Sequence, residues 1–148
     1  MNQTDQTTPE TSQDNTSPHQ LTPYELLGGE DAIRRLVKQF YFYMDTLPQA
    51  QGIRRLHAAD LSGAEEKLFL YLTGWLGGPQ LFIEKYGHPR LRARHLSFSI
   101  GTDEANQWMT CMQKALTDIT ANENLRAQLT IALTDLALHM RNKKDTAD

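Results

Sequence analysis

The chain has 148 residues, a formal net charge of −3 and a sequence pI of about 5.9. This weakly acidic balance lacks the excess of basic residues typical of nucleic-acid partners, and no stretch reaches the roughly 18 apolar residues of a membrane-spanning helix. The single cysteine, Cys111, excludes an intramolecular disulfide. We therefore expect one domain with a sizeable core, no nucleic-acid or membrane partner, and a cytoplasmic location.

Residues 1–20 differ in composition from the rest of the chain. They consist mainly of Thr, Gln, Ser, Asn and Asp, and such a segment buries too little apolar surface to offset the entropy of ordering it. We predict a polar N-terminal arm over residues 1–20, a folded domain over residues 21–140 and a polar C-terminal tail over residues 141–148.

Beyond the arm, apolar residues recur at helical spacing, and strand alternation is nowhere sustained. The first long helix has an apolar face formed by Ile33, Leu36, Val37, Phe40, Tyr41 and Met44. Gly28 and Gly29 stand before this helix and Pro48 follows it, which marks its two ends. Shorter helices are expected near residues 23–27, 48–56 and 89–96.

Three further long helices follow along the chain. Ser62 and Glu65 have capping-box spacing, which predicts a helix start at Ser62, and the Gly77-Gly78-Pro79 run predicts the end of that helix. Thr102 is expected to cap the third long helix with its hydroxyl group. The predicted buried faces of the last two helices are Trp108, Met112, Ala115, Leu116 and Ile119, and then Leu125, Leu129, Ala132, Leu133, Leu136 and Met140. The predicted fold class is therefore all-α.

Residues 87–98 combine histidines, arginines and a proline in a short segment. A neutral histidine is the commonest side-chain metal ligand, and the arginine fork binds both oxygens of a carboxylate. Haem needs both functions, because it carries an iron and two propionates, and globins hold it through one histidine. A basic surface loop beside a structural histidine is the alternative that these residues alone leave open.

Several motifs occur in a fixed order along residues 22–140. They are Gly28-Gly29, Phe40-Tyr41, the Leu61–Glu66 segment, Gly77-Gly78-Pro79, the His88–His95 string and Trp108. In these motifs the chain resembles the truncated haemoglobins of group II. The resemblance implies a two-over-two helical sandwich that encloses haem b, with O2 and other diatomic ligands bound at the iron.

The resemblance also implies roles for residues on one side of the haem, called the proximal side. His95 matches the iron ligand, and Arg92 and Arg94 just before it are expected to pair with the haem propionates. Members of the family usually carry a proline soon after this histidine, where the present chain has Ser97. We expect this departure to loosen the backbone after the ligand.

On the opposite, distal side, Tyr41 and Trp108 match residues that face the bound ligand. A tyrosine hydroxyl donates or accepts and an indole N–H only donates, so both are expected to stabilise O2 in the pocket. His57 matches a position at the haem edge, where three roles stay open: a hydrogen-bond donor, an internal iron ligand like Tyr41, or a surface residue. Ala64 stands where other globins carry a distal histidine, and Leu68 matches an apolar residue over the haem.

Two functions share these residues. One is tight, reversible binding of O2, and the other is redox conversion of NO or peroxide, which requires an unidentified reductase. CO is a further expected ligand, and we expect a monomer or a weak dimer. Two alternatives of other classes remain: a haem-free helical interaction module, and a zinc protein that uses His88 and His95. The zinc alternative ranks last, because the sequence offers no plausible third ligand nearby.

Overall fold

The computed structural model describes residues 20–144. Within them every regular element is helical: α2 (Pro23–Leu27), α3 (Glu30–Thr46), the 3-10 helix η2 (Pro48–Ala50), α4 (Gln51–Arg54), α5 (Ser62–Trp75), α6 (Leu81–Tyr86), α7 (Leu91–Arg94), α8 (Thr102–Ile119) and α9 (Glu123–His139). The all-α prediction is confirmed, and no helix of residues 20–144 is long and apolar enough to cross a membrane. Residues 1–19 of the predicted arm and 145–148 of the predicted tail lie outside this range.

The four predicted long helices are α3, α5, α8 and α9, and the predicted short ones are α2, η2 with α4, and α7. The sequence analysis missed α6. This helix spans only Leu81–Tyr86 and buries a single residue, Phe82, so it has no repeating apolar face that a periodicity argument could detect.

The entry into the first long helix depends on local chemistry. The Thr22 hydroxyl accepts a hydrogen bond from the Glu25 backbone N–H, and the Glu25 carboxylate accepts from Thr22 N–H in return, which forms a capping box at the start of α2. Gly28 and Gly29 then adopt φ values of 122° and 80°, a region that residues with a Cβ rarely enter. This turn redirects the chain from α2 into α3.

The predicted apolar face of α3 is entirely buried, as the helical spacing requires. On the predicted face of α8, Met112, Ala115 and Leu116 are buried, but Trp108 and Ile119 are only half-buried. The α9 prediction has a similar outcome: Leu125, Leu129, Leu133 and Met140 are buried, whereas Ala132 and Leu136 are half-buried. Two of these half-buried residues, Trp108 and Leu136, line the cavity that is described in the next section.

The predicted capping box at Ser62 is wrong. Ser62 is already the first residue of α5, the N-cap position is Leu61, and no side chain caps the helix from there. Instead, the Asp60 carboxylate accepts a hydrogen bond from Ser62 N–H at 2.9 Å, so the capping side chain lies two residues before the predicted one. An acidic group at this position also complements the positive end of the helix dipole.

The predicted hydroxyl cap of Thr102 is also wrong. The N-cap of α8 is Gly101, and the Glu104 carboxylate reaches back to accept a hydrogen bond from Gly101 N–H at 2.7 Å. The Thr102 hydroxyl accepts from the Arg141 guanidinium at 3.0 Å. The start of α8 is thereby joined to the end of α9.

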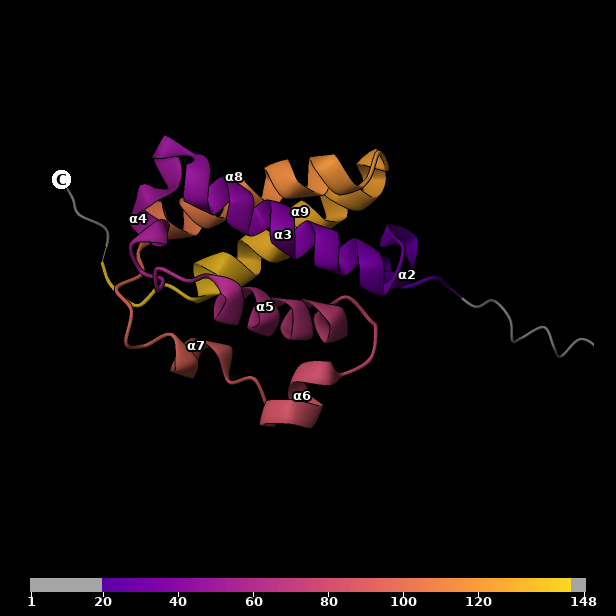
Figure 1. Ribbon diagram of the computed structural model, residues 1–148, viewed down its shortest axis with the longest axis horizontal. Helices are drawn as coiled ribbons and strands as arrows, with labels where there is room; N and C mark the ends of the chain where they lie inside the picture. The colour runs from indigo at the N-terminus through magenta and orange to yellow at the C-terminus, as the bar shows by residue number, and fades with distance from the viewer. Residues whose placement is uncertain (1–19, 145–148) are drawn as a thin grey trace, which may run out of the picture.

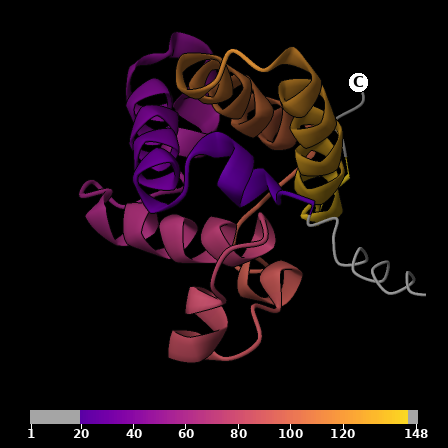
Figure 2. The ribbon, with the colours of Figure 1, turned by 90° about the vertical axis from the view of Figure 1, so that its right-hand side faces the viewer.

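The four long helices form two layers. α3 packs along α8 and against α5, and α8 packs against α9. Figures 1 and 2 show α5 running below α3, with α6 and α7 on the far side of α5. This is the predicted two-over-two sandwich, and it leaves α7 separated from α3 by the layer that contains α5.

The centre of the sandwich is a core of large apolar side chains. Those with almost no exposure include Phe40, Phe69, Ile33, Leu36, Met44, Leu72, Met112, Leu116 and Leu133. Cys111 is also fully buried, and burial raises the pKa of its thiol to about 11. A thiol in that state is a packing group rather than a nucleophile.

Candidate functional site

A cavity of about 730 Å³ opens between α5, α7 and the ends of α8 and α9. Every predicted site residue except Arg92 lines it: Tyr41, His57, Ala64, Leu68, Arg94, His95 and Trp108. Apolar side chains such as Ile53, Leu72, Phe82 and Met140 make up much of the remaining wall. The fold therefore brings together residues that lie up to 67 positions apart in the sequence, from Tyr41 to Trp108.

A second hollow, of about 630 Å³, lies at the C-terminal end of α9. Its lining residues are Asp135, Leu138, His139, Arg141, Lys143 and Lys144. It is polar and contains none of the predicted site residues, so the first cavity is the candidate site.

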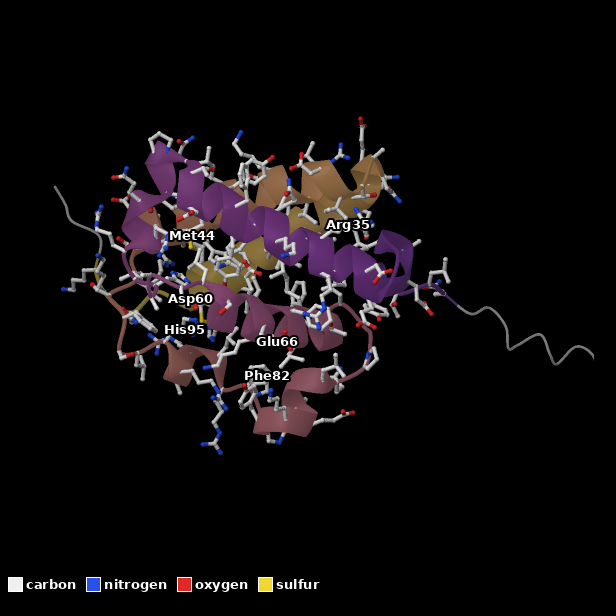
Figure 3. The ribbon with its side chains drawn as sticks, in the orientation of Figure 1. Arg35, Met44, Asp60, Glu66, Phe82 and His95 are labelled. Atoms are coloured by element: carbon white, nitrogen blue, oxygen red, sulfur yellow. The ribbon has the colours of Figure 1, made fainter. Side chains whose placement is uncertain are left out.

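His95 follows the last residue of α7 and is half-buried in the cavity wall. Its Nδ1 lies 2.7 Å from the backbone oxygen of Leu91, one turn earlier. A carbonyl oxygen can only accept, so Nδ1 carries the proton in the neutral ring and Nε2 keeps its lone pair. A histidine held in this way is oriented for metal coordination through Nε2. Figure 3 shows His95 at the end of α7, on the side nearer to Asp60.

His57 has the same local arrangement on another wall. Its Nδ1 lies 2.8 Å from the backbone oxygen of Ile53, and its ring meets the Tyr41 ring edge-on at 5.8 Å between centroids. Burial lowers the pKa of His57 and the positive charge of Arg54 lowers it further, which together outweigh the opposite effect of the hydrogen bond to Ile53. The ring is therefore neutral near pH 7, and the lone pair of Nε2 makes it an acceptor or a metal ligand rather than the donor that was one of its predicted roles.

Tyr41 is only 6% exposed, and its hydroxyl donates a long hydrogen bond of 3.4 Å to the backbone oxygen of Ala64. Burial raises the pKa of this phenol well above its ordinary value, and the nearby Glu65 carboxylate raises it further. The hydroxyl therefore keeps its proton. Because a bond of this length is weak, the hydroxyl is free to turn toward a better acceptor in the cavity.

Trp108 is half-buried, and its ring packs against Phe40 at 5.1 Å between centroids. Its indole N–H makes no hydrogen bond to any group of residues 20–144. An N–H without a partner in a largely apolar wall costs free energy unless something in the cavity accepts from it. This donor is available to an acceptor atom of a molecule bound in the cavity.

The two predicted propionate partners are placed differently. Arg94 lines the cavity, and its guanidinium lies over the Phe82 ring at 5.3 Å and donates to the backbone oxygen of Pro89. Arg92 is exposed and lies outside the cavity lining, where it donates to the backbone oxygen of Arg141 at 3.0 Å. Both arginines thus donate to backbone oxygens, since Arg94 also has weaker contacts with the oxygens of Tyr86 and His88 at 3.4 Å, but only Arg94 belongs to the cavity lining.

Lys67 is a cavity residue that the sequence analysis missed. It lies three residues after Ala64 on α5 and one before Leu68, so the helical spacing of those two residues was the signal that could have found it. Lys67 and Arg94 supply two exposed cations at the cavity, which matches the two carboxylates of a haem.

The donor set of the cavity fits haem better than a bare metal ion. Residues 20–144 contain no group of three or more His, Cys, Asp or Glu side chains placed to hold an ion, which argues against the zinc alternative through His88 and His95. A porphyrin supplies four nitrogen ligands itself and requires one side-chain ligand, for which His95 is suitably oriented. The apolar walls and the two cations suit the ring and its propionates respectively.

Known proteins show the same fold and sequence pattern. The bacterial-like globin family model matches residues 22–142. The group 2 truncated haemoglobin YjbI of Bacillus subtilis (strain 168) is 36% identical over 126 residues, which cover 85% of this chain and 92% of that protein.

Solved structures agree with this match. The group II 2-on-2 haemoglobin of the plant pathogen Agrobacterium tumefaciens superposes with a TM-score of 0.83 at 43% identity, covering 88% of this chain and all of that one (100%). The cold-adapted truncated haemoglobin of the Antarctic bacterium Pseudoalteromonas haloplanktis TAC125 gives a TM-score of 0.81 at 42% identity, covering 83% and 99% of the two chains.

These matches disfavour the haem-free interaction module and establish the cofactor as haem b with its iron. They also agree with the cavity, its oriented histidine and its unpartnered donor. The chain belongs to the bacterial-like globin family, as one of the group II truncated haemoglobins.

Proposed function

We propose that this globin holds its haem iron through His95 and binds O2, CO or NO beside Tyr41 and Trp108. The observation that carries the proposal is the Nδ1 contact of His95 with the Leu91 carbonyl, which leaves Nε2 as the ligating atom at the cavity. When bound, haem supplies an iron with a coordination position for a diatomic molecule. The protein residues orient the cofactor and surround the ligand.

Tyr41 and Trp108 supply the polar contacts for the ligand. Trp108 N–H is an unmatched donor, and the Tyr41 hydroxyl has only a long bond to give up. Because burial keeps the phenol protonated, both groups donate to a ligand that carries partial negative charge. The apolar residues around them exclude water and so strengthen these hydrogen bonds. Two donors of this kind favour slow release, which suits protection or sensing better than bulk transport.

Arg94 and Lys67 are proposed to bind the two haem propionates. Both are exposed cations in the cavity lining, where long side chains can reach carboxylates at the rim. Each exposed ion pair contributes only about 0–1 kcal/mol, so these contacts orient the haem more than they hold it. The binding free energy comes mainly from burial of the ring and from the iron–histidine bond.

Conversion of NO or peroxide at the same site is the second candidate function. Donors that stabilise a diatomic ligand also polarise a peroxide O–O bond, and the free Trp108 N–H favours both. A sustained cycle needs electrons from a reductase. We further infer a cytoplasmic monomer or weak dimer, in keeping with one free, buried cysteine.

The proposal is tested by measuring haem content and the iron–histidine Raman band in His95→Ala and in the control variant His139→Ala. His139→Ala changes an exposed histidine on α9 that lines the other hollow, so it should keep full haem content and a normal Soret band. His95→Ala should lose stoichiometric haem, or release it rapidly, and should lose the iron–histidine Raman band. Normal haem content with an unchanged Raman band in His95→Ala would refute the proposal.

A further inference from the structure

Asn142 lies just after α9, and its side chain reaches the loop that follows α7. Its Nδ2 donates to the backbone oxygens of His95 at 3.1 Å and of Phe98 at 2.8 Å. Its Oδ1 accepts from Ile100 N–H at 2.9 Å, and its own backbone N–H donates to the Ile100 oxygen at 2.8 Å. One residue therefore binds three points of the loop from 95 to 100, which we call the proximal loop.

These bonds use both amide protons and the amide oxygen of Asn142. The residues that it binds, His95, Phe98 and Ile100, all line the haem cavity. The contacts thus attach the end of α9 to the wall that carries the proposed iron ligand.

The proximal loop has few other constraints. α7 is a helix of four residues with no buried member, and Leu96 and Phe98 are 56% and 39% exposed. The loop's remaining backbone hydrogen bonds include Leu96 N–H to the Ala93 oxygen at 3.3 Å and Phe98 N–H to the His95 oxygen at 3.0 Å, both of which close local turns. Apolar packing therefore holds this segment weakly, and polar contacts must fix it.

Neighbouring contacts keep Asn142 itself in place. The Arg92 guanidinium donates to the Arg141 backbone oxygen at 3.0 Å, and Arg141 donates to the Thr102 hydroxyl at 3.0 Å. Lys143 contributes a backbone bond to Ile100 at 3.2 Å and an ion pair with Glu104 at 3.4 Å. The segment after α9 is therefore joined to α7 on one side and to the start of α8 on the other.

We propose that Asn142 is a positioning residue for the proximal histidine. By holding the His95 carbonyl and the loop behind it, Asn142 restricts the orientation of the imidazole and the shape of the proximal wall. The inference rests on the proposed function in one respect, namely that His95 ligates the iron. A ligand that directly follows so short and exposed a helix needs a partner of this kind, since outer-shell hydrogen bonds orient metal ligands.

The test uses the full haem-loaded chain and Asn142→Ala. Removal of the hydrogen bonds should broaden or shift the iron–histidine Raman band and speed haem transfer to an apoglobin acceptor about fivefold to tenfold, as expected for the net loss of roughly 1 kcal/mol. A second readout needs no haem. Amide hydrogen exchange at Ile100 should accelerate in the apoprotein, because its N–H loses the Asn142 acceptor.

Two variants separate positioning from general loss of structure. Asn142→Asp keeps an acceptor for Ile100 N–H but loses the donors to His95 and Phe98, so it should shift the Raman band while Ile100 stays protected from exchange. Asn106→Ala removes an exposed asparagine on α8 outside the cavity lining and should behave like the unaltered protein in each measurement.

An unchanged Raman band and haem transfer rate in both Asn142 variants would overturn the inference. Failure of the unaltered protein to take up haem, or retention of the iron–histidine band in His95→Ala, would instead overturn the proposed function. In that case the exchange rate at Ile100 still decides whether Asn142 holds the loop.

Discussion

Trp108 is a cavity residue whose only polar side-chain group is available to a ligand. It is large and apolar enough to belong in a core, yet it is half-buried at a cavity and its N–H has no partner within residues 20–144. Tyr41 beside the same cavity has a long hydrogen bond to Ala64. At the scale of single residues, the site therefore offers two hydrogen-bond donors, the Tyr41 hydroxyl and the Trp108 N–H, to a bound ligand.

The first prediction concerns Trp108→Phe. This change keeps an aromatic ring against Phe40 but removes the N–H donor together with part of the ring volume. It should speed O2 dissociation about tenfold, which corresponds to the loss of roughly 1.4 kcal/mol of hydrogen bonding. CO accepts hydrogen bonds poorly, so its dissociation should change less. Stopped-flow displacement measures both rates, and equal changes for the two gases would indicate a steric rather than a polar effect.

The second prediction concerns His57 and the ferrous iron without an added ligand. The lone pair on Nε2 makes neutral His57 a candidate internal ligand, so a fraction of low-spin absorption bands is expected at neutral pH. His57→Ala should reduce that fraction. A purely five-coordinate or water-bound iron in the unaltered protein at every pH would contradict the idea.

The pH dependence of His57 follows from its lowered pKa. The unfolded chain takes up a proton near the ordinary histidine pKa of about 6.5, whereas the folded chain does so only at lower pH. The stability that neutral His57 contributes is therefore present above about pH 6.5 and is lost as the pH falls through the folded-state pKa. The free energy of unfolding of the apoprotein should therefore fall between about pH 7 and about pH 5, and it should fall less in His57→Gln, which cannot take up this proton. Urea titration of the two apoproteins at both pH values measures the difference.

At the scale of elements, four of the helices begin with a side chain that accepts a hydrogen bond from a nearby backbone N–H group. α2 and α9 are capped by their own neighbours, Thr22 and Asn122. α5 and α8 begin instead with carboxylates from Asp60 and Glu104 that bind the first backbone N–H groups. The predicted serine and threonine caps failed because each helix begins one residue earlier than expected: Ser62 and Thr102 are already the first helical residues. The N–H groups of Glu65 and Ala105 therefore donate to the backbone oxygens of Leu61 and Gly101.

The third prediction concerns the cap of α9. The Asn122 side chain accepts from Leu125 N–H at 3.0 Å, so Asn122→Ala should lower the free energy of unfolding by about 1 kcal/mol. Asn124→Ala is the matched control, because it changes an exposed asparagine in the same helical turn without removing the cap. Urea titration of the apoproteins measures both changes, and equal values for the two variants would contradict the assignment.

At the scale of the whole molecule, the cavity separates α7 and its loop from the long helices that carry Tyr41 and Trp108. The sandwich is well packed around α3 and α8, and the cavity of about 730 Å³ lies between α5, α7 and the ends of α8 and α9. Much of the cavity wall is apolar, and a haem ring packed against it removes apolar surface from water. The cofactor should therefore contribute much of the stability of this region.

The fourth prediction concerns this contribution. A ligand that binds only the folded chain stabilises it by about 4 kcal/mol when its free concentration is a thousandfold above its dissociation constant. Haem-loaded protein should therefore melt well above the apoprotein, and the difference should shrink strongly in His95→Ala. Calorimetry of the unaltered protein and of His95→Ala, each with and without haem, measures the four melting temperatures. Identical melting temperatures with and without haem would show that the cavity does not depend on its cofactor.

The sequence by itself predicted the four long helices, the whole of the α3 face, most of the α9 face and all but one (Arg92) of the cavity residues that were expected from the resemblance. Apolar periodicity is a local property, since one helix face repeats every three or four residues wherever the helix packs. The His88–His95 string and Trp108 also carried the family resemblance, because they lie at characteristic places along the chain. These signals needed no knowledge of which helix touches which.

Only the tertiary structure decided which polar groups meet. It placed Arg92 on the Arg141 carbonyl instead of in the cavity and brought Lys67 to the cavity wall. It also joined Asn142, which the sequence analysis assigned to a polar tail, to His95 across 47 residues of sequence. A side chain's hydrogen-bond partner depends on the position of distant backbone, and no pattern within one segment records that position.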